Sequence, residues 1–229
     1  MALTITYYPL GDSALVANFG DIISTVINSA IRQLTSELSN KNINGLSEVV
    51  PGYSTLTVYY DLRLISFEDL ISELEILKNE LPIVTNSEKV LKTIPVWYNG
   101  PDLDYVSHYT GLHKEDVIKI HSEKEYLVYM IGFAPGFPYL GGMDKRIATP
   151  RKENPRLKIE EGSVGIAAEQ TGVYPIATPG GWQLIGTTPL RLFDIKKDKP
   201  SFLEVGDYVH FVSITEKDFY DLKENEYGD

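Results

Sequence analysis

The sequence predicts an α+β protein in which a small sheet-and-helix domain precedes an antiparallel β-barrel. Up to Leu81, strand-like segments alternate with two amphipathic helices. After residue 125, short strand-like segments are separated by turns rich in Gly and Pro, as in barrels. Because residues 82–89 between these two patterns are polar and irregular, we predict an N-terminal α+β domain at 1–85 and a barrel domain at 86–229.

In the first domain, the predicted order is two strands, a helix, two strands and a second helix. The first helix is expected at Ile22–Leu38, because its apolar residues recur at helical spacing. Ser66 is expected to cap the second helix, since Asp69 follows three residues later in an arrangement close to a capping box, and Pro82 to end it. The strands are expected at Leu3–Tyr8, Ala14–Phe19, around Val49–Val50 and at Thr55–Tyr60.

The second domain is expected to contain three short helices among its strands. Asp102 is interpreted as the cap, and Asp104 as the first-turn charge, of a helix at Leu103–Thr110. Further helices are expected at Lys114–Ser122 and Thr215–Asn225. The strands are expected at Val90–Tyr98, Tyr126–Ile131, Ser163–Ala168, Gly172–Ile176, Trp182–Ile185, Leu190–Asp194 and Tyr208–Ile214.

Composition excludes several classes of function. The 229 residues carry a formal net charge of −11, which argues against nucleic-acid binding. The absence of Cys excludes disulfides, thiol catalysis and Cys-based zinc sites. No segment approaches the roughly 18 apolar residues of a membrane span, and the N-terminus lacks the basic start of a signal peptide. We therefore expect a cytoplasmic protein with no membrane partner.

The stretch from Gly132 to Asp194 has the composition of a binding surface. It holds 10 of the 18 Gly and 7 of the 13 Pro, interleaved with aromatics that a flexible linker would lack. Gly and Pro fix turns while buried aromatics hold a loop in place. The stretch also carries seven basic and six acidic residues in an otherwise acidic chain. This local balance suits a small anion, although solvated loop charges would give the same count.

Common catalytic motifs are absent. The sequence has no G-x-x-x-x-G-K-[ST] phosphate loop, no G-x-G-x-x-G after a strand and no G-x-S-x-G elbow. Its four histidines do not form H-E-x-x-H, so we predict no metal site. His113 and His121 are interpreted as helix-surface or half-buried residues. His108 precedes the Gly-rich stretch and is a candidate acid or base.

Several long motifs stand in a fixed order. They read FAPGFPYL at 133–140, GSVGIA at 162–167, QTG at 170–172 and PGGW at 179–182, preceded by PLGDSAL at 9–15 and PGY at 51–53. In these motifs the sequence resembles the family that contains the B subunit of 5-oxoprolinase, allophanate-hydrolase subunit 1 domains and the Kip sporulation-kinase inhibitor. The resemblance covers nearly the whole chain.

The resemblance implies a fold, an activity and partners. The C-terminal domain is expected to be a cyclophilin-like barrel, with no prolyl isomerase activity inferred from the fold. The chain is expected to act with a homologous, larger C subunit and a separate A subunit of 5-oxoprolinase, and to be inactive alone. Together they would cleave the lactam 5-oxoproline to L-glutamate, with ATP as co-substrate together with Mg²⁺ and no bound organic cofactor.

The candidate site combines backbone donors with a few polar side chains. Backbone N–H groups exposed at glycines could stabilise developing charge, and the catalytic candidates are His108, Gln170 and Tyr174. Equally, the glycines could serve loop geometry alone and Trp182 could merely pack. The substrate-binding candidates are Phe133, Pro135, Gly136, Phe137, Arg151, Arg156, Thr171, Gly172, Gly180, Gly181 and Trp182.

One position departs from the family pattern. Thr187 stands where Arg is expected in many relatives. If that Arg contacts an anion, another base such as Arg151 or Arg156 must do so here.

Two alternatives to a 5-oxoprolinase subunit stay open. The chain could be a regulatory inhibitor of a sporulation-type histidine kinase, or a partner in carboxyl transfer of the urea carboxylase or allophanate hydrolase type. The motifs are common to all three.

Overall fold

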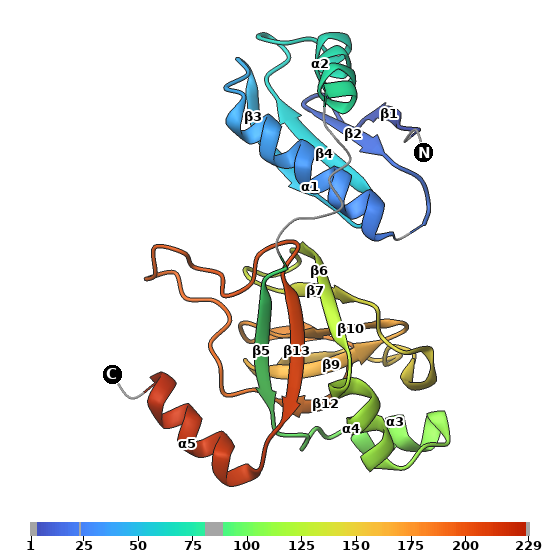
Figure 1. Ribbon diagram of the computed structural model, residues 1–229, viewed down its shortest axis with the longest axis vertical. Coiled ribbons are helices and arrows are strands. Elements are labelled where there is room, and N and C mark those ends of the chain that lie inside the picture. The colour runs from blue at the N-terminus through green and yellow to red at the C-terminus, as the bar shows by residue number, and fades with distance from the viewer. Residues whose placement is uncertain (1–3, 23, 81–88, 228–229) are drawn as a thin grey trace. The chain divides into compact units, whose positions relative to one another are not determined.

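The computed structural model describes residues 4–22, 24–80 and 89–227, which form two compact units at Met1–Glu88 and Lys89–Asp229 (Figure 1). Each unit combines helices with β-sheet, so the predicted α+β class is confirmed. The predicted domain boundary at 85/86, the predicted helix end at Pro82 and the predicted strand start at Leu3 lie outside the described residues.

The N-terminal unit is a four-stranded antiparallel sheet with two helices. The strand order is β1-β2-β4-β3, and the predicted order of strands and helices along the chain is confirmed. The elements are β1 Thr6–Pro9, β2 Ala14–Asn18, α1 Thr25–Asn40, β3 Leu46–Pro51, β4 Thr55–Tyr60 and α2 Phe67–Glu80.

Both helices begin at a serine cap. Ser24 Oγ accepts a hydrogen bond from the Val26 N–H at 3.2 Å, so α1 begins three residues after the predicted Ile22. Ser66 Oγ accepts from the Asp69 N–H at 3.1 Å and donates to the Asp69 carboxylate at 2.7 Å, which confirms the predicted cap. The apolar faces of both helices share one core with the inward residues of the sheet: Leu15, Ala17, Leu56, Val58, Ile31, Leu34, Leu38, Leu70, Leu74 and Leu77.

The C-terminal unit is a seven-stranded sheet that closes on itself. Its strand order is β12-β9-β10-β7-β6-β13-β5, in which only the β5–β13 pair is parallel (Figure 1). The strands are β5 Leu91–Val96, β6 Glu125–Ile131, β7 Pro138–Gly141, β9 Ser163–Ala167, β10 Gln170–Val173, β12 Gln183–Thr187 and β13 Tyr208–Ser213.

A single bridge joins the two edges of this sheet. Trp97, which follows β5, pairs antiparallel with Thr187 at the end of β12. Each residue's N–H donates to the other's carbonyl, at 2.9 and 2.8 Å. Closure removes exposed strand edges and gives the barrel-like sheet that the sequence predicts. Ile94, Val128, Leu140, Val164 and Ile185 are among the side chains that fill its interior.

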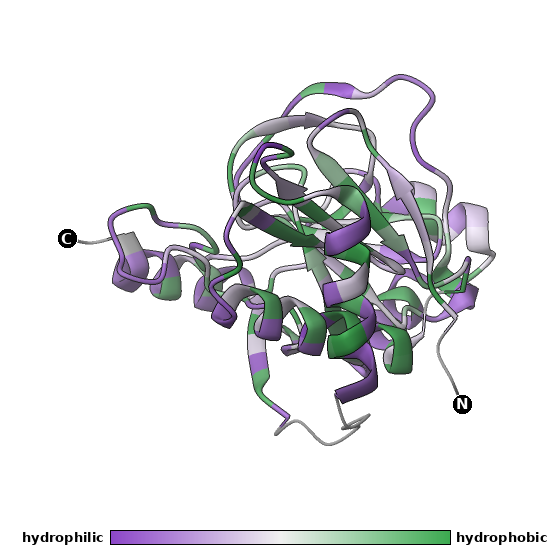
Figure 2. Cartoon of the chain, turned by 90° about the horizontal axis from the view of Figure 1, so that it is seen from above, coloured by the Kyte–Doolittle hydropathy of each residue, from purple (hydrophilic) through white to green (hydrophobic). Residues whose placement is uncertain are grey.

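Helices and a second small sheet complete the unit. The helices are α3 Leu103–Thr110, α4 Lys114–Ser122 and α5 Glu216–Tyr227, with a short 3₁₀ turn at Lys145–Ile147. The first two have the bounds that the sequence predicts. In Figure 2 the helix next to the C-terminus is mainly hydrophilic, and it is anchored by the buried Phe219, whose ring lies 5.5 Å from that of Trp97. The small sheet pairs β8 Arg156–Ile159 with β11 Thr178–Gly180.

Two kinds of strand prediction fail. The predicted strand at Leu190–Asp194 is wrong, because this segment folds back on a loop and only Phe193 forms an isolated bridge, to Ser201. The loop is fixed locally: the Asp194 N–H donates to the Pro200 carbonyl at 2.8 Å. Conversely, β7, β8 and β11 are not predicted, because they are short and β7 and β11 contain proline and glycine, which lower strand propensity.

His121 is buried, so its interpretation as a surface or half-buried residue is wrong. Its Nδ1 lies 2.8 Å from the Tyr98 hydroxyl and its Nε2 lies 2.8 Å from Thr171 Oγ1. The ring stacks on Phe211 with centroids 4.6 Å apart. Because both nitrogens have partners, the imidazole can enter the core without leaving a polar atom unsatisfied.

Acid should weaken the fold through His121. Burial lowers the pKa of His121 to about 3, below the value of about 6.5 in an unfolded chain. Between these two pH values the unfolded state binds one more proton, so the free energy of unfolding falls by roughly 1.4 kcal/mol per pH unit as the pH drops.

Urea unfolding of the native chain and a His121→Phe variant at about pH 7 and about pH 5 checks this. We expect the native chain to lose about 2 kcal/mol more than the variant over this interval, because only the native chain has the titrating group. The same loss in both proteins would contradict the assignment of a buried neutral imidazole.

Candidate functional site

An aromatic pocket of about 260 Å³ opens on the barrel unit within the Gly- and Pro-rich stretch. The turn before β7, the loop before β8 and the segment through β11 to Trp182 form its walls. We call it the aromatic pocket. It is lined by Phe133, Phe137, Tyr139, Arg151, Pro155, Tyr174, Pro179, Gly180, Gly181 and Trp182.

Phe137 is the centre of the aromatic cluster under this pocket. Its ring meets the rings of Tyr139, Tyr174 and Trp182 edge-on, with centroids 5.1, 5.2 and 5.4 Å apart. Phe137 and Tyr174 are each 1% exposed and Trp182 is 5% exposed. Edge-to-face packing of this kind holds each ring in one orientation, so the pocket has a rigid floor.

Phe133 stands at the mouth of the pocket in a strained turn. Its φ is 69°, and the Ala134 N–H donates to the Gly132 carbonyl at 2.9 Å, which together describe a γ-turn with a positive central φ. The side chain is 65% exposed, although its ring meets that of Phe137 at 5.6 Å. A bulky residue in this conformation costs of order 1–3 kcal/mol, and such strain clusters at ligand sites.

Arg151 brings a positive charge to the aromatic wall. Its guanidinium carbon lies 6.0 Å from the centroid of the Trp182 ring, within the range of a cation–π contact. Among the described residues it forms no ion pair with a carboxylate. An exposed guanidinium beside an apolar floor offers planar, two-point binding to a carboxylate or phosphate.

Tyr174 is a neutral phenol at the base of the pocket. Burial raises its pKa to about 12, against the smaller opposing effects of a backbone hydrogen bond with Trp182 and of the nearby Arg151 charge. Burial likewise raises the pKa of Tyr139, again opposed by Arg151. Both hydroxyls therefore keep their protons at neutral pH and can donate to a bound carbonyl.

The glycines around the pocket serve different purposes. A Cβ on Gly180 would lie 2.5 Å from the Tyr174 hydroxyl and 2.7 Å from Ile159 Cδ1, so this position requires glycine for packing. Gly172 is similarly enclosed, 2.9 Å from the Pro138 carbonyl. Gly181 has no positive φ and its nearest neighbour would be 3.5 Å away, so nothing in the fold requires glycine there.

Asp102 does not cap α3 with its side chain, which corrects the interpretation from sequence. It occupies the N-cap position, but no side-chain cap hydrogen bond forms. Its carboxylate is buried and accepts from the Leu184 N–H at 2.7 Å, Arg156 at 2.7 Å and Lys152 at 3.2 Å. A buried carboxylate needs partners of opposite charge, and here they are Lys152 in the loop before β8 and Arg156, the first residue of β8. Asp104 does lie in the first helical turn, as predicted.

The structure brings together half of the predicted site residues. Those that line the aromatic pocket are Phe133, Phe137, Arg151, Tyr174, Gly180, Gly181 and Trp182. The other predicted site residues do not line it. His108 is exposed in the last turn of α3, and Arg156 pairs with Asp102. Gln170 is half-buried in β10, Thr171 and Gly172 are buried in the same strand, and Pro135 and Gly136 lie in the turn before β7. Thr187, at the departure from the family pattern, donates to Asn99 Oδ1 at 2.9 Å.

Four residues of the pocket region are not predicted from sequence. Tyr139, Pro155 and Pro179 line the pocket, and Asp102 binds Lys152 and Arg156 on either side of the segment that contains Pro155. Tyr139 and Pro179 belong to the motifs FAPGFPYL and PGGW, so their motif membership was a usable signal. For Asp102 no local signal exists, since its partners are about fifty and more residues away in the sequence.

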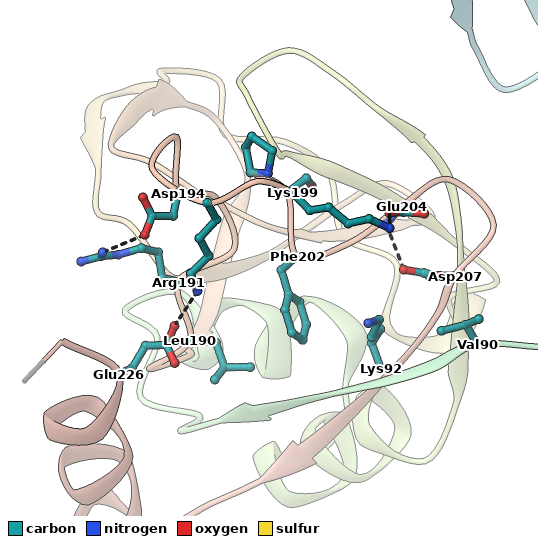
Figure 3. A pocket seen from close by; sticks show the side chains of 13 residues that line it. Val90, Lys92, Leu190, Arg191, Asp194, Lys199, Phe202, Glu204, Asp207 and Glu226 are labelled. Carbon is teal, nitrogen blue, oxygen red and sulfur yellow. Dashed lines mark hydrogen bonds and ion pairs between the residues drawn. The ribbon is translucent and has the colours of Figure 1, made fainter. Parts of the chain in front are cut away.

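A second cavity, of about 520 Å³, lies beside β5 and the loop before β13 (Figure 3). None of the predicted site residues lines it. Three of its four basic side chains pair with acidic neighbours: Arg191 with Asp194 at 3.4 Å, Lys197 with Glu226 at 4.0 Å and Lys199 with Glu204 at 3.1 Å. The fourth, Lys92, lies over the ring of Phe202, 5.3 Å from its centroid. These pairs largely satisfy the cavity's charges from within, so the aromatic pocket is the better candidate.

The described residues offer no group of three His, Asp or Glu side chains that could hold a metal ion. Among the same residues, none of the helices is both long and apolar enough to cross a membrane.

Comparison with known proteins identifies the family. The carboxyltransferase domain family, subdomain C and D, matches residues 5–203. The chain belongs to this family. It is 44% identical to the B subunit of 5-oxoprolinase from Bacillus subtilis (strain 168), over 97% of this chain and 99% of that protein. The same-named protein of Escherichia coli O157:H7 is 39% identical, over 90% and 94%. The predicted resemblance is confirmed.

Other similar proteins are longer than this chain. The crystal structure of TTHA0988 matches with a TM-score of 0.79 and 34% identity, over 88% of this chain but only 40% of that one. Urea amidolyase of Lachancea kluyveri is 25% identical over 93% of this chain, which amounts to 14% of that protein. The chain thus spans less than half of these two relatives, whereas it matches the two 5-oxoprolinase B subunits along almost their full length.

Replacing each of the two neighbouring glycines by alanine tests whether glycine is required there by packing. We expect Gly180→Ala to lower the free energy of unfolding by about 1–3 kcal/mol, because its methyl group overlaps Tyr174 and Ile159. Gly181→Ala is the matched control and should change it by no more than about 0.5 kcal/mol. Thermal unfolding of both variants measures the difference, and equal losses would contradict the assigned roles.

Proposed function

We propose that this chain is the B subunit of an ATP-dependent 5-oxoprolinase, which cleaves the lactam 5-oxoproline to L-glutamate together with the C and A subunits. Near-full-length identity of 44% and 39% to proteins that are named as 5-oxoprolinase B subunits supports this. The name of these relatives describes one part of an assembly, so the proposal includes partner chains.

The observation that carries the proposal is an exposed guanidinium beside an aromatic floor. 5-Oxoproline is a small flat ring with a carboxylate next to the ring nitrogen. Trp182 and Phe137 offer the apolar surface, Arg151 offers a partner for the carboxylate, and Tyr174 offers a hydroxyl donor for the lactam oxygen. The volume of about 260 Å³ suits a ligand of this size.

The proposed chemistry asks mainly for positioning. A lactam is resonance-stabilised, so its carbonyl carbon is a poor target for water. Transfer of the terminal phosphoryl group of ATP to the lactam oxygen would make that carbon more electrophilic. One water would then add to this carbon, and breaking of the ring C–N bond would give an acyl phosphate with a free amine. A second water would hydrolyse the acyl phosphate to glutamate and inorganic phosphate. Such steps depend on alignment and charge stabilisation more than on a protein nucleophile.

ATP with Mg²⁺ enters this proposal as co-substrate. The sequence has no glycine-rich phosphate loop, and Arg151 is the one cation among the described residues that line the aromatic pocket. We therefore propose that the phosphoryl-transfer site is completed in the assembled complex and that the isolated chain is inactive.

Carboxyl transfer is the second candidate function. It is favoured by the carboxyltransferase description of the family and by the urea amidolyase relative. A carboxylated substrate would also place a carboxylate near Arg151. The identity to that relative is lower than to the 5-oxoprolinase B subunits, which is why we place it second.

An oxoproline-dependent ATPase assay tests the proposed function. We expect no activity with this chain alone or with the C and A subunits alone, and coupled release of phosphate and glutamate when all three are combined. Glutamate release by this chain alone, or none from the assembly, would overturn the proposal.

In the same assembly, His108→Ala tests the acid–base role proposed from sequence, since loss of a general acid or base lowers kcat by roughly 100-fold or more.

Removing the charge of Arg151 should weaken substrate binding selectively. We expect Arg151→Gln to raise KM for 5-oxoproline by about tenfold to a hundredfold, the effect of losing one charge-assisted contact of roughly 1.5–3 kcal/mol. Arg146→Gln is the matched control, because Arg146 is exposed and paired with Asp144 at 2.9 Å outside the pocket. Equal KM values in the two variants would contradict the role of Arg151.

A further inference from the structure

One buried carboxylate joins the two walls of the aromatic pocket. Asp102 is 5% exposed and lies at the N-terminal end of α3. Its Oδ1 accepts hydrogen bonds from Arg156 at 2.7 Å and Lys152 at 3.2 Å, while its Oδ2 accepts from the Leu184 N–H at 2.7 Å. We call Asp102, Lys152, Arg156 and Leu184 the Asp102 network.

The network holds the loop before β8 at both ends. Lys152 directly follows Arg151, and Arg156 directly follows Pro155, so the two network cations bracket the loop that lines the pocket. Only the segment Glu153–Pro155 separates these two anchors. Because both ends of this loop bind one carboxylate, the backbone at Arg151 is held in place, and its side chain extends from a fixed position at the edge of the pocket.

The same carboxylate holds the opposite wall. The Asp102 N–H donates to the Leu184 carbonyl at 2.9 Å, in addition to the bond from the Leu184 N–H to the carboxylate. Arg156 also donates to the Trp182 carbonyl at 3.4 Å, and the Lys152 N–H donates to the Gly181 carbonyl at 2.7 Å. The chain from Gly181 to Leu184 is therefore hydrogen-bonded to Asp102, Lys152 and Arg156.

Electrostatics keeps the carboxylate ionised. Burial by itself raises the pKa of Asp102, but hydrogen bonds from Arg156, from the Leu184 N–H and from Lys152 together hold it below its ordinary value. The charged form therefore persists at neutral pH, where it offsets one of the two network cations.

We propose that Asp102 is the positioning residue that sets the placement of Arg151 relative to Trp182, and so the affinity of the aromatic pocket for a flat ring that bears a carboxylate. This inference rests on the proposed function for the identity of the ligand. The geometric part of the inference is independent of the proposed function, because the network is formed by this chain alone. Asp102 acts through its neighbours and is not among the residues that line the pocket.

The geometric part can be tested without substrate. The chain has two tryptophans, so a Trp97→Phe background leaves Trp182 as the only indole emitter. In that background we expect Asp102→Asn to increase acrylamide quenching of Trp182 by about twofold or more, because the wall opens locally. Asp104→Asn is the matched control, since Asp104 lies two residues away and is exposed in a surface ion pair with Lys114. Equal quenching in both variants would overturn the positioning role.

The functional part is tested in the assembly with the C and A subunits, using 5-oxoproline. We expect Asp102→Asn to raise KM by about tenfold with kcat changed less than about threefold, because a misplaced Arg151 loses ground-state and transition-state binding alike. In an Arg151→Gln background the same substitution should raise KM far less, since the group through which it acts is gone. An equal rise in both backgrounds would show that Asp102 does not act through Arg151.

A second variant covers loss of folding. If Asp102→Asn does not yield folded protein, Lys152→Gln releases one end of the loop and leaves the Arg156 pair in place, and it should move quenching and KM in the same direction. No change in either readout would overturn the proposal. An assembly that is inactive even with the native chain would refute the proposed function, while the quenching experiment would still decide the geometry.

Discussion

The fit of residues 97–102 against β12 is the constraint on which the barrel unit depends. The Trp97–Thr187 bridge closes the sheet, and the chain then continues along β12, where the Gly100 N–H donates to the Ile185 carbonyl at 3.1 Å. A Cβ on Gly100 would lie 2.3 Å from the Ile185 carbonyl carbon, so only glycine permits this approach. The same close approach delivers Asp102 to Leu184. The same segment, residues 97–102, therefore both closes the barrel and supports the aromatic pocket.

Periodic segments could be predicted from the sequence because local chemistry determines them. The helices at Leu103–Thr110 and Lys114–Ser122 have regular apolar spacing and clear ends, and the structure gives them the predicted bounds. Segments rich in proline and glycine could not be assigned, because a strand such as β11 exists only through its pairing with β8. The strand prediction at Leu190–Asp194 failed for the opposite reason: its apolar residues lie in a loop that is not hydrogen-bonded into a sheet, apart from the isolated bridge at Phe193.

The candidate site divides in the same way. Aromatics and glycines of the long motifs, such as Phe137, Gly180 and Trp182, meet in one pocket as their sequence proximity suggests. Residues chosen for their chemistry alone fared differently, since Thr171 binds His121 in the core and Arg156 binds Asp102. A side chain's capacity for a role is visible in sequence, but its actual partner depends on contacts between distant segments. Asp102 and His121 owe their burial to such contacts.

The strain at Phe133 links the pocket to the proposed assembly. Its γ-turn is held on one side by the hydrogen bond from the Gly132 N–H to the Phe137 carbonyl at 3.1 Å. On the other side lies Gly136, which has a positive φ and where a Cβ would lie 2.9 Å from Phe193 Cβ. The fold therefore gives up stability to keep a large apolar ring exposed at the mouth of the pocket. Exposed aromatics of this kind gain free energy when a ligand or a second protein surface covers them. A ring fixed there by the backbone, beside an exposed guanidinium, is better suited to closing over a bound molecule than to packing within its own domain.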